Sequence, residues 1–510
     1  MLAHQLTLAT VIRANALTNA HRVALIDDEI TITHAELDRR TNRLARRMQA
    51  EGIVAGDRIA ILLPDGIRLA EILIAASKIG AISILLNWRL AAPEIAWIIA
   101  DGAPKAIFHS EPFASLLPDD PRATRHAVAG DPLADRQYLR WTAEGPDAAP
   151  ANLVANTSPL FIMYTSGTTG RPKGCVQSHE STIAHALAMA ARRGLNRDDR
   201  NLSVNPLFHV AGLGHLITMF AIGGATVFAP QGAGPAGPLE AAAAHSCTIA
   251  TLGQPLIAAR QHVDAALLAR LRLRTVTGGS GLVAPEAFAF VQDEWNALLV
   301  GGYGQTESNS FSLLIDYPDM LEHPTALGWP MPHVDIRLLD ASGHPIPELE
   351  AEGEIGLRGP SVTLGYWNNP EATEEALGTG WLRSGDLARR DALGLFHMLG
   401  RTKELIKSGG ENVYPAEVEP ILRALPGVAD AAIAGVRDAR WGEAVKAFIV
   451  LEDGHDLPLT AIAQACRARI AGYKRPRYLE FIDRIPRDYM GKIRRYQLSE
   501  RPVTPEQALD

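Results

Sequence analysis

The stretch "YTSGTTGRPKG", residues 164–174, decides how the rest of the chain is interpreted. Hydroxyl side chains and glycines follow one another in it, and a lysine comes soon after (Thr165, Ser166, Gly167, Thr168, Thr169, Gly170 and Lys173). Glycines expose backbone N–H groups and a lysine adds positive charge, so the segment is predicted to hold a triphosphate tail. Its spacing differs from the P-loop pattern G-x-x-x-x-G-K-[ST]. The alternative is a plain glycine-rich hairpin tip, which would need fewer hydroxyl groups.

Strands and helices alternate around this loop. "LFIMY" before it is expected to be a strand, and "CVQSHESTIAHALAMA" after it a helix. Further upstream, "DRIAILLPDG" is typical of a buried strand and "IRLAEILIAASKIG" of a helix. Nearly continuous apolar strands that alternate with helices predict a parallel sheet covered on both faces. The fold class is therefore α/β, with doubly wound parallel sheets up to about residue 300.

The pattern changes after about residue 330. "VDIRLLDASGHPIP" and "GEIGLRGPSVTLGYW" are short and rich in glycine, which favours antiparallel strands and a small β-barrel. Beyond Gly400 a small α+β segment follows, with helices expected at "AEVEPILRAL" and "LTAIAQACRARI". We therefore expect a large domain over residues 1–400 and a small one over residues 401–510.

Bulk composition limits the function classes. A chain of 510 residues is too long for one core, and 47% hydrophobic with 21% charged residues is ordinary for a globular protein. A net charge of −8 argues against nucleic acid as a partner. The three cysteines lie far apart, as reduced thiols of a cytoplasmic protein do, and no apolar run is long enough for a membrane span.

The octet "GGYGQTES", residues 301–308, offers nucleotide-binding chemistry. Tyr303 is suited to stack on a base, and Thr306 to donate a hydrogen bond to a phosphate oxygen. Glu307 is suited to hold Mg²⁺, which prefers one or two carboxylates together with phosphate oxygens. The alternative is an ordinary turn with a tyrosine.

Three later motifs add polar groups. Asp386 in "GWLRSGDLARRD" is an acceptor that can take both hydroxyls of a ribose. In "GRTKELIKSGGENVYP", Arg401 is a fixed cationic fork, and the pair Gly409 and Gly410 allows close approach of the backbone. Lys492 in "PRDYMGKIRR" follows a glycine on an expected tight turn, although most such lysines are surface residues.

Taken together and in this order, the motifs resemble one family, the acyl-adenylate-forming superfamily of acyl-CoA synthetases, aryl-CoA ligases, luciferases and adenylation domains. The resemblance covers residues ~10 to 500 and rests on "YTSGTTGRPKG", "YGQTE", "SGDL", "GRTKELIKSGGENVYPAEVE" and "GKIRR". Details such as "LLNWRL", "RWGE" and "YKRPRY" are most similar to 4-chlorobenzoate- and carnitine-type CoA ligases.

The resemblance implies two half-reactions with ATP, Mg²⁺ and CoA. A carboxylate attacks the α-phosphate of ATP and expels pyrophosphate, and the CoA thiol then displaces AMP. By this resemblance, residues 165–173 hold the β- and γ-phosphates, Thr306 the α-phosphate, Glu307 the Mg²⁺ and Asp386 the ribose. Adenine is framed by Tyr303 and by a glycine-rich segment (Gly279, Ser280 and Gly281). That segment reads "TGGSGLVAP" where the family commonly shows "SGGAPL".

The same resemblance assigns roles to the last hundred residues. Lys492 would contact both the attacking carboxylate and the α-phosphate, and would stabilise the charge of the transition state. Lys403 lies at the family's hinge, about which the small domain turns between the half-reactions. The pantetheine path would be lined by Gly409 and Gly410. The CoA nucleotide would meet two arginines and two aromatic residues (Arg89, Trp441, Tyr473 and Arg475), for which surface and packing roles are the alternative.

The acyl pocket is implied by resemblance to include a histidine and small or apolar residues (His209, Val210, Gly212, Leu213, Gly302 and Ser308). Amino-acid-activating members of the family usually carry an aspartate near this point to pair with the substrate ammonium; "LFHVAGL" has none, so the resemblance disfavours amino acids as substrates. Arg260 stands where malonate-activating members of the family carry an arginine for the second carboxylate, but it is expected to be a solvated helix residue. Those members also carry an arginine where this chain has Gly302, so the resemblance disfavours a dicarboxylic substrate. The expected substrate is a small-to-medium, mostly apolar monocarboxylic acid.

Three functions remain open at this point. The first is an ATP-dependent acid–CoA ligase, expected by resemblance to be a homodimer. The second shares the adenylation step but loads the phosphopantetheine of a carrier protein; Arg89, Trp441 and Arg475 favour free CoA. The third is a nucleotide-binding regulator without turnover, against which the intact set of charged residues argues. A luciferase-like oxygenase is the remotest alternative.

Overall fold

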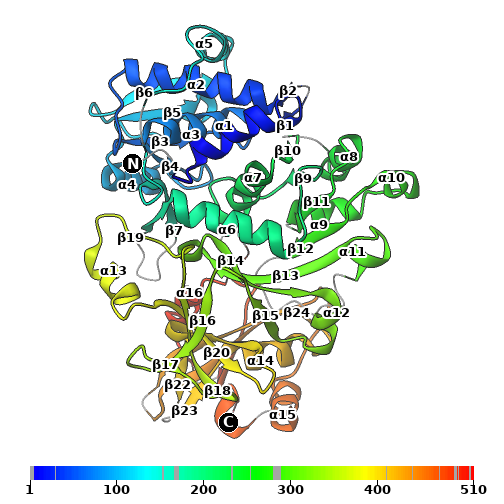
Figure 1. Ribbon diagram of the computed structural model, residues 1–510. Helices are drawn as coiled ribbons and strands as arrows, with labels where there is room; N and C mark the ends of the chain where they lie inside the picture. The colour runs from blue at the N-terminus through cyan, green and yellow to red at the C-terminus, as the bar shows by residue number, and fades with distance from the viewer. Residues whose placement is uncertain are drawn as a thin grey trace. The chain divides into compact units, whose positions relative to one another are not determined.

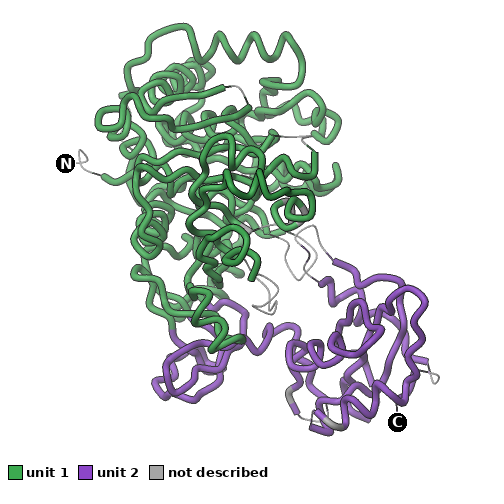
Figure 2. The backbone as a smooth tube through the Cα atoms, turned by 90° about the vertical axis from the view of Figure 1, so that its right-hand side faces the viewer, with its two compact units in different colours: residues 1–336, 357–382 green, residues 337–356, 383–510 purple. Residues whose placement is uncertain are grey.

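Parallel strands buried between helices occupy most of the chain, as the apolar runs of the sequence predict (Figure 1). The computed structural model describes residues 5–28, 30–151, 154–165, 172–230, 234–252, 254–278, 289–408, 411–438, 440–469, 471–487, 491, 493–504 and 507–509. These residues form two compact units (Figure 2). Unit 1 comprises residues 1–336 and 357–382, and unit 2 comprises residues 337–356 and 383–510.

Unit 1 contains two sheets. In the first, the strand order is β2-β1-β10-β9-β11-β12-β13-β14-β15, and in the second it is β6-β5-β3-β4-β7-β8-β19. The first sheet consists of β1 (Val23–Asp27), β2 (Ile30–Thr33), β9 (Arg200–Ser203), β10 (Ala225–Phe228), β11 (Ile249–Leu252), β12 (Thr275–Gly278), β13 (Leu298–Gln305), β14 (Ser310–Asp316) and β15 (Ala326–Pro330). The second consists of β3 (Arg58–Leu62), β4 (Ile82–Leu85), β5 (Ala106–Ser110), β6 (Thr124–Ala129), β7 (Pro159–Thr165), β8 (Lys173–Ser178) and β19 (Gly365–Tyr366).

The first sheet is parallel in its centre and antiparallel at both margins, and the second is antiparallel at one margin only. In the first sheet, β1, β10, β9, β11, β12 and β13 pair in parallel, and β2, β14 and β15 are added antiparallel. In the second, β6, β5, β3, β4 and β7 pair in parallel, and β8 and β19 are antiparallel. The α/β class predicted from the sequence is thereby confirmed.

The helices of unit 1 cover these sheets. They are α1 (Leu8–Thr18), α2 (His34–Ala50), α3 (Ile67–Ile79), α4 (Ala92–Gly102), α5 (Pro132–Ala143), α6 (His179–Arg192), α7 (Val210–Ile222), α8 (Gly237–Ala244), α9 (Gln254–Arg260), α10 (Ala265–Arg270), α11 (Phe290–Asp293), α12 (Tyr317–Glu322) and α13 (Pro370–Leu377), with the 3₁₀ turns η1 (Glu111–Leu116) and η3 (Thr306–Ser308). Thr33 caps α2 by accepting a hydrogen bond from the backbone of Glu36.

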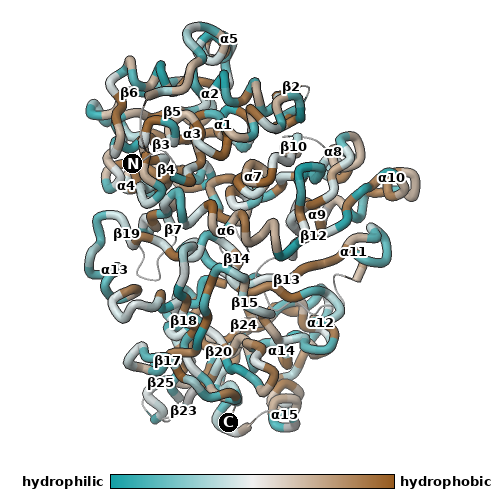
Figure 3. Tube along the Cα trace, in the orientation of Figure 1, coloured by the Kyte–Doolittle hydropathy of each residue, from teal (hydrophilic) through white to brown (hydrophobic). Residues whose placement is uncertain are grey.

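The main core of unit 1 brings together residues of both sheets and of α1, α2, α3 and α7. Helix α7 is buried along most of its length and is strongly hydrophobic in Figure 3. A helix that is apolar on every side must be enclosed by other elements. The first turn of α7 therefore lies inside unit 1, where the family resemblance predicts the acyl pocket.

Unit 2 contains short antiparallel strands, then an open sheet with helices. The first group is ordered β17-β16-β18-β20-β21 and comprises β16 (Asp335–Leu339), β17 (Pro345–Ile346), β18 (Ala351–Arg358), β20 (Leu382–Arg390) and β21 (Phe396–Arg401). The second is ordered β23-β22-β25-β24, with β26 beside β25, and comprises β22 (Ile406–Ser408), β23 (Glu411–Val413), β24 (Val428–Asp438), β25 (Gly442–Leu451) and β26 (Tyr478–Phe481). Its helices are α14 (Pro415–Arg423), α15 (Leu459–Arg469) and α16 (Arg495–Ser499), with η4 (Thr402–Glu404) and η5 (Gly472–Lys474).

The antiparallel strands expected after residue 330 and the two helices expected after Gly400 are thus present. Among the described residues, no helix is both long and apolar enough to cross a membrane. The boundary between residues 400 and 401, with a hinge at Lys403, stays a prediction.

Candidate active site

The loop of residues 166–171 lies outside the described residues, but both of its ends are placed. Thr165 ends β7 and Lys173 begins β8, and these two residues face each other in the antiparallel register. The Thr165 hydroxyl donates a hydrogen bond to the Lys173 carbonyl oxygen at 3.4 Å. The prediction that a helix follows the loop directly is wrong, because β8 comes first and α6 begins only at His179. Cys175 and Val176 are buried strand residues, and a short apolar run does not distinguish strand from helix.

A carboxylate, a phenol and an ammonium group meet beside this hairpin. Tyr366 of β19 donates a hydrogen bond from its hydroxyl to Glu307 Oε1 at 2.8 Å. The Lys173 ammonium nitrogen lies 5.1 Å from the centroid of the same tyrosine ring. Burial, and then the charge of Glu307, raise the pKa of Tyr366, so the phenol remains a hydrogen-bond donor. Glu307 is therefore held in place by a neutral group, and this hydrogen bond brings no positive charge to its carboxylate.

The backbone around Glu307 is fixed by hydrogen bonds from strands far away in the sequence. The Gln177 side chain donates to the Thr306 carbonyl oxygen at 2.6 Å, and the Thr363 N–H donates to the Glu307 carbonyl oxygen at 2.8 Å. Thr306 and Ser308 are buried, and the Ser308 hydroxyl accepts a hydrogen bond from Ser312 at 2.9 Å. This turn is thus a rigid support for the predicted phosphate and metal ligands.

The chemistry of this site fits Mg²⁺ bound together with a nucleotide. Among the described residues, no group of three or more His, Cys, Asp or Glu side chains could hold a metal alone. Mg²⁺ keeps several water or phosphate ligands and needs only one or two carboxylates from the protein. Glu307 supplies one such carboxylate, and the phosphates would supply the rest.

Tyr303 lies on β13 and is largely buried, at a point where the register with β14 shifts. A side chain on the next residue, Gly304, would overlap the carbonyl of Ser310, so the close approach of the two strands requires glycine there. The predicted partners of Tyr303 around adenine (Gly279, Ser280 and Gly281) lie outside the described residues. The stacking role of Tyr303 stays a prediction.

In unit 2, the two predicted ribose and nucleotide ligands form an ion pair. Asp386 of β20 faces Arg401 of β21 across the antiparallel register, and Arg401 Nε lies 3.0 Å from Asp386 Oδ1. The Asp386 side chain is 3% exposed and that of Arg401 is 39% exposed. Glu354 accepts a hydrogen bond from the N–H of Gly385, which has a positive φ of 75°. The backbone of β20 just before Asp386 therefore depends on a glycine.

The four residues predicted for the CoA nucleotide fall in both units. In unit 1, the Arg89 guanidinium lies 4.6 Å from the centroid of the Trp88 ring and 5.4 Å from that of Phe208. In unit 2, the Trp441 ring has Arg440 at 4.8 Å and Arg477 at 5.0 Å from its centroid.

The other two members of the CoA set lie near the end of α15. Tyr473 is 38% exposed, and Arg475 donates to the Arg467 carbonyl oxygen at 3.4 Å. Together with Trp441 they supply aromatic and cationic groups of the kind that bind a phosphorylated adenine.

Each predicted acyl-pocket residue has a packing role in the structure. His209 caps α7, since its Nδ1 accepts a hydrogen bond from the Ala211 N–H at 3.2 Å. A side chain at Gly212 would overlap the carbonyl groups of Asn205 and Pro206, and one at Gly302 would overlap the Phe311 ring. Val210 is buried. The small residues thus allow close packing at the start of α7 and in the middle of β13. The contact of these residues with a substrate stays a prediction.

Arg260, the position considered for a second substrate carboxylate, lies at the surface of unit 1. Its Nε donates to Glu294 Oε2 at 3.0 Å, and its guanidinium lies 4.4 Å from the centroid of the Phe290 ring. The expectation of a solvated helix arginine agrees with this geometry.

Comparison with protein families decides the identity of the chain. The family model for AMP-binding enzymes matches residues 12–367, and the model for the C-terminal domain of AMP-binding enzymes matches residues 417–492. This chain belongs to the AMP-binding enzyme family. The resemblance to acyl-adenylate-forming enzymes that the motifs predict is thereby confirmed.

Three proteins illustrate how similar the relatives of this AMP-binding enzyme are. A feruloyl-CoA synthase of Amycolatopsis sp is 37% identical over 489 residues, which cover 94% of this chain and 96% of the relative. ATP-bound MatB from Rhodopseudomonas palustris has a TM-score of 0.85 at 26% identity, covering 98% of this chain and 99% of that one. The o-succinylbenzoate CoA synthetase MenE from Bacillus subtilis, in complex with its acyl-adenylate intermediate, has a TM-score of 0.82 at 27% identity, covering 97% and 98%. MenE has also been solved with ATP and a magnesium ion.

Several predicted residues of the AMP-binding enzyme lie outside the described part of the chain. They are Ser166, Gly167, Thr168, Thr169, Gly170, Gly279, Ser280, Gly281, Gly409, Gly410 and Lys492. The roles assigned to them stay predictions.

Sequence reasoning missed two features of the site. Tyr366 stands in "TLGYW", where no pattern links it to Glu307, 59 residues earlier. The second feature is that the guanidinium groups of Arg440 and Arg477 both lie against the Trp441 ring. The sequence signal for this cluster is weak, since arginine and aromatic residues merely alternate nearby.

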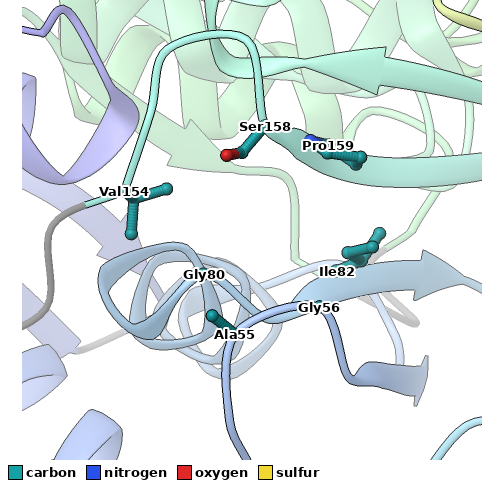
Figure 4. Close-up of a pocket in the computed structure, with 7 residues that line it drawn as sticks. All are labelled: Ala55, Gly56, Gly80, Ile82, Val154, Ser158 and Pro159. Atoms are coloured by element: carbon teal, nitrogen blue, oxygen red, sulfur yellow. The ribbon is translucent and has the colours of Figure 1, made fainter.

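A surface pocket of about 300 Å³ lies away from these groups (Figure 4). Its lining comes from the starts of strands and the turns before them (Ala55, Gly56, Gly80, Ile82, Val154, Ser158 and Pro159). Pro159 and Ile82 are the first residues of β7 and β4, whereas Thr165 is the last residue of β7. Ligands of parallel α/β sheets bind outside the carboxyl ends of the strands, so this pocket is at the wrong edge for the nucleotide.

Proposed function

We propose that this AMP-binding enzyme is an ATP-dependent carboxylic acid–CoA ligase that forms an acyl-AMP intermediate and then an acyl-CoA thioester. One observation carries the proposal: Glu307, held by a neutral tyrosine next to Lys173, offers a charged carboxylate at the end of the phosphate hairpin. The relatives support the same class, since they include a feruloyl-CoA synthase and a CoA synthetase solved with its acyl-adenylate. An AMP-forming ligase that uses ATP, Mg²⁺ and CoA is the enzyme predicted from the sequence, and these findings confirm that prediction.

The first half-reaction makes the carboxyl group reactive. An oxygen of the substrate carboxylate attacks the α-phosphorus of ATP, the bond to the β-phosphate oxygen breaks, and pyrophosphate leaves. We assign to Lys173 the attraction of the departing phosphates, and to Thr306 a hydrogen bond to the α-phosphate. Mg²⁺ bound to Glu307 would neutralise charge on the phosphates. Positioning and charge stabilisation are the main sources of catalysis in such transfers.

The second half-reaction transfers the acyl group. The sulfur of CoA attacks the acyl carbon, the bond to the phosphate oxygen of AMP breaks, and the thiol proton is released. We assign the CoA nucleotide to Arg89, Trp441, Tyr473 and Arg475, and the pantetheine to Gly409 and Gly410. The substrate is a small-to-medium monocarboxylic acid, and the enzyme is a cytoplasmic homodimer; size-exclusion chromatography and cell fractionation test these last two points.

The decisive test is mass spectrometry of the purified enzyme with ATP, Mg²⁺, CoA and a panel of carboxylic acids. An acyl-CoA that appears with an equal amount of AMP is the expected result. Acyl-adenylate without a thioester would instead indicate a carrier protein as acceptor. No product with any acid, although ATP binds, would indicate a regulator.

The K492A variant tests whether Lys492 acts in the first half-reaction alone. Loss of a cation from the transition state of adenylation is expected to slow ATP–pyrophosphate exchange by about 10²–10³-fold. Thioester formation from supplied acyl-adenylate should persist, because Lys492 is assigned to the first half-reaction alone. Equal loss of both activities would contradict the assignment.

A further inference from the structure

Three histidines gather in unit 1 around the first half of α7: His185 and His215 are buried, and His333 is partly buried. The rings of His185 and His333 lie 5.6 Å apart, edge to face, and the ring of His215 lies 6.4 Å from that of Phe311. Burial lowers the pKa of His185 to about 3 and those of His215 and His333 to about 4. All three imidazoles are therefore neutral at pH 7, and each carries one donor and one acceptor nitrogen.

His185 lines a small, partly enclosed cavity of about 10 Å³. The other lining residues are Phe161, Thr182, Val210, Leu213, Gly214 and Asn309. Val210 belongs to the predicted acyl pocket, and Phe311, which contacts His215, fills the space above Gly302 of the same pocket. A cavity of this volume takes one group of the size of a water molecule. It is thus suited to the tip of an acyl group rather than to a ring.

The hydrogen bonds around the cavity leave one acceptor unused. Asn309 donates to Gln177 Oε1 at 2.7 Å and to the Ser361 carbonyl oxygen at 2.9 Å, and Thr182 donates to the Ser178 carbonyl oxygen at 2.8 Å. The His185 ring donates to the backbone of Phe311, while its Nε2 has no partner among the described residues. The donating nitrogen is thus Nδ1, and Nε2 is left as an acceptor in a neutral ring. A buried acceptor of this kind is stabilised by an incoming O–H or N–H group.

The described residues that line the cavity carry no charged side chain. Its described lining contains neither acids nor basic side chains other than the neutral His185. The nearby Arg193 is turned to His215, to whose Nε2 its guanidinium donates at 3.1 Å, and to Thr275 at 3.3 Å. A second carboxylate on the substrate would therefore be buried there without a cation, which is costly. An uncharged donor meets no such cost.

We propose that His185 recognises a hydroxyl group at the end of the acyl substrate remote from the carboxylate, so that the enzyme prefers terminally hydroxylated carboxylic acids. The inference rests on the proposed ligase function and makes the substrate class more specific. The hydroxyl donates to His185 Nε2, and Val210 and Leu213 pack against the carbon that bears it. An ether or a keto oxygen, which cannot donate, does not satisfy this acceptor.

The test compares acids that differ by one oxygen. Cinnamic acid is paired with 4-hydroxycinnamic and 4-methoxycinnamic acids, and hexanoic acid with 6-hydroxyhexanoic acid. The kcat/KM of AMP release is measured with CoA for the wild type and for H185L. Because a deoxy analogue leaves a buried acceptor unpaired, the wild type should favour the hydroxy acid of at least one pair by about 10–100-fold. H185L should lower this preference to about threefold or less while it keeps or raises the rate with the deoxy acid.

His179 gives the matched control, because it is a second buried histidine on α6, with Nδ1 accepting from the Leu8 N–H and no part in the cavity. H179L should keep the preference for the hydroxy acid even if it is less stable. H185F serves if H185L does not fold. Equal kcat/KM within every pair for the wild type, or a preference that survives in H185L, would overturn the inference and leave the ligase function intact. No AMP with any acid would overturn the proposed function itself.

Discussion

Glu307 in unit 1 and Asp386 in unit 2 are both carboxylates predicted to bind ATP, yet their surroundings differ. Glu307 accepts a hydrogen bond from the neutral hydroxyl of Tyr366, whereas Asp386 is paired with the cationic Arg401. The hydrogen bond to Glu307 brings no charge to its carboxylate, whereas the ion pair with Arg401 neutralises Asp386 directly. A charged carboxylate attracts a divalent cation, and a neutralised one still accepts hydrogen bonds from uncharged hydroxyls. The partner of each carboxylate therefore indicates its ligand more specifically than the carboxylate itself.

The largest effect that separates the two sites is expected for E307Q. Without the charge, the magnesium-dependent stabilisation of several kcal/mol is lost, which corresponds to a fall in adenylation rate of about a hundredfold or more. ATP–pyrophosphate exchange at increasing Mg²⁺ should show a weaker apparent affinity for the metal. E322Q, at an exposed carboxylate of α12, is the control. An unchanged Mg²⁺ dependence in E307Q would remove the distinction between the two carboxylates.

D386N should weaken binding of the ribose of ATP without changing the dependence on Mg²⁺. Loss of hydrogen bonds to a charged acceptor is expected to raise the KM for ATP by about 10–100-fold, with the Mg²⁺ dependence unchanged. The wild type should also discriminate against 2′-deoxy- and 3′-deoxy-ATP, and D386N should not. If D386N kept that discrimination, Asp386 would not be the ribose ligand.

R401M is expected to weaken unit 2 as well as nucleotide binding. It leaves the carboxylate of Asp386, 3% exposed, without its ion-pair partner, at a cost of about 1–3 kcal/mol, because Arg401 itself is only partly buried. Urea denaturation measures this loss. The double variant R401M/D386N should recover part of it, since the buried charge is then absent. Strictly additive effects would show that the two side chains act independently.

The smallest effect is expected for Y366F. The variant keeps the Glu307 charge and removes one hydrogen bond, so adenylation should slow by only about 3–10-fold. Kinetics of ATP–pyrophosphate exchange measure it, with Y496F at an exposed tyrosine as control. If Y366F lost as much activity as E307Q, the orientation of the Glu307 carboxylate, rather than its charge, would determine the adenylation rate.

Local patterns predicted much of this fold, and long-range pairing explains what they missed. The apolar strands and the helices at α14 and α15 depend on neighbouring residues, and the sequence is sufficient to place them. The sequence predicts a helix where β8 lies, since the residues of β8 form a strand only by pairing with β7 and β19.

The candidate site divides in the same way. Thr165, Lys173, Glu307, Asp386 and Arg401 were chosen from contiguous motifs. The partner Tyr366 and the cluster of His185, His215 and His333 come from segments that only the tertiary fold brings together. Motif spacing predicts which groups act on the ligand, but not what supports them.

The division into units has a consequence for recombination between the genes of such enzymes. Unit 2 takes residues 337–356 from the middle of the chain before it continues at residue 383, so the polypeptide passes between units three times. A single recombination point near the end of the gene would therefore give a hybrid in which β20 and β21 come from one parent and β24 and β25 from the other. The contacts of β21 with α14 would then join residues that were never selected together. Functional chimeras are expected to need matched residues on both sides of that contact, or a second crossover that transfers the inserted strands as well.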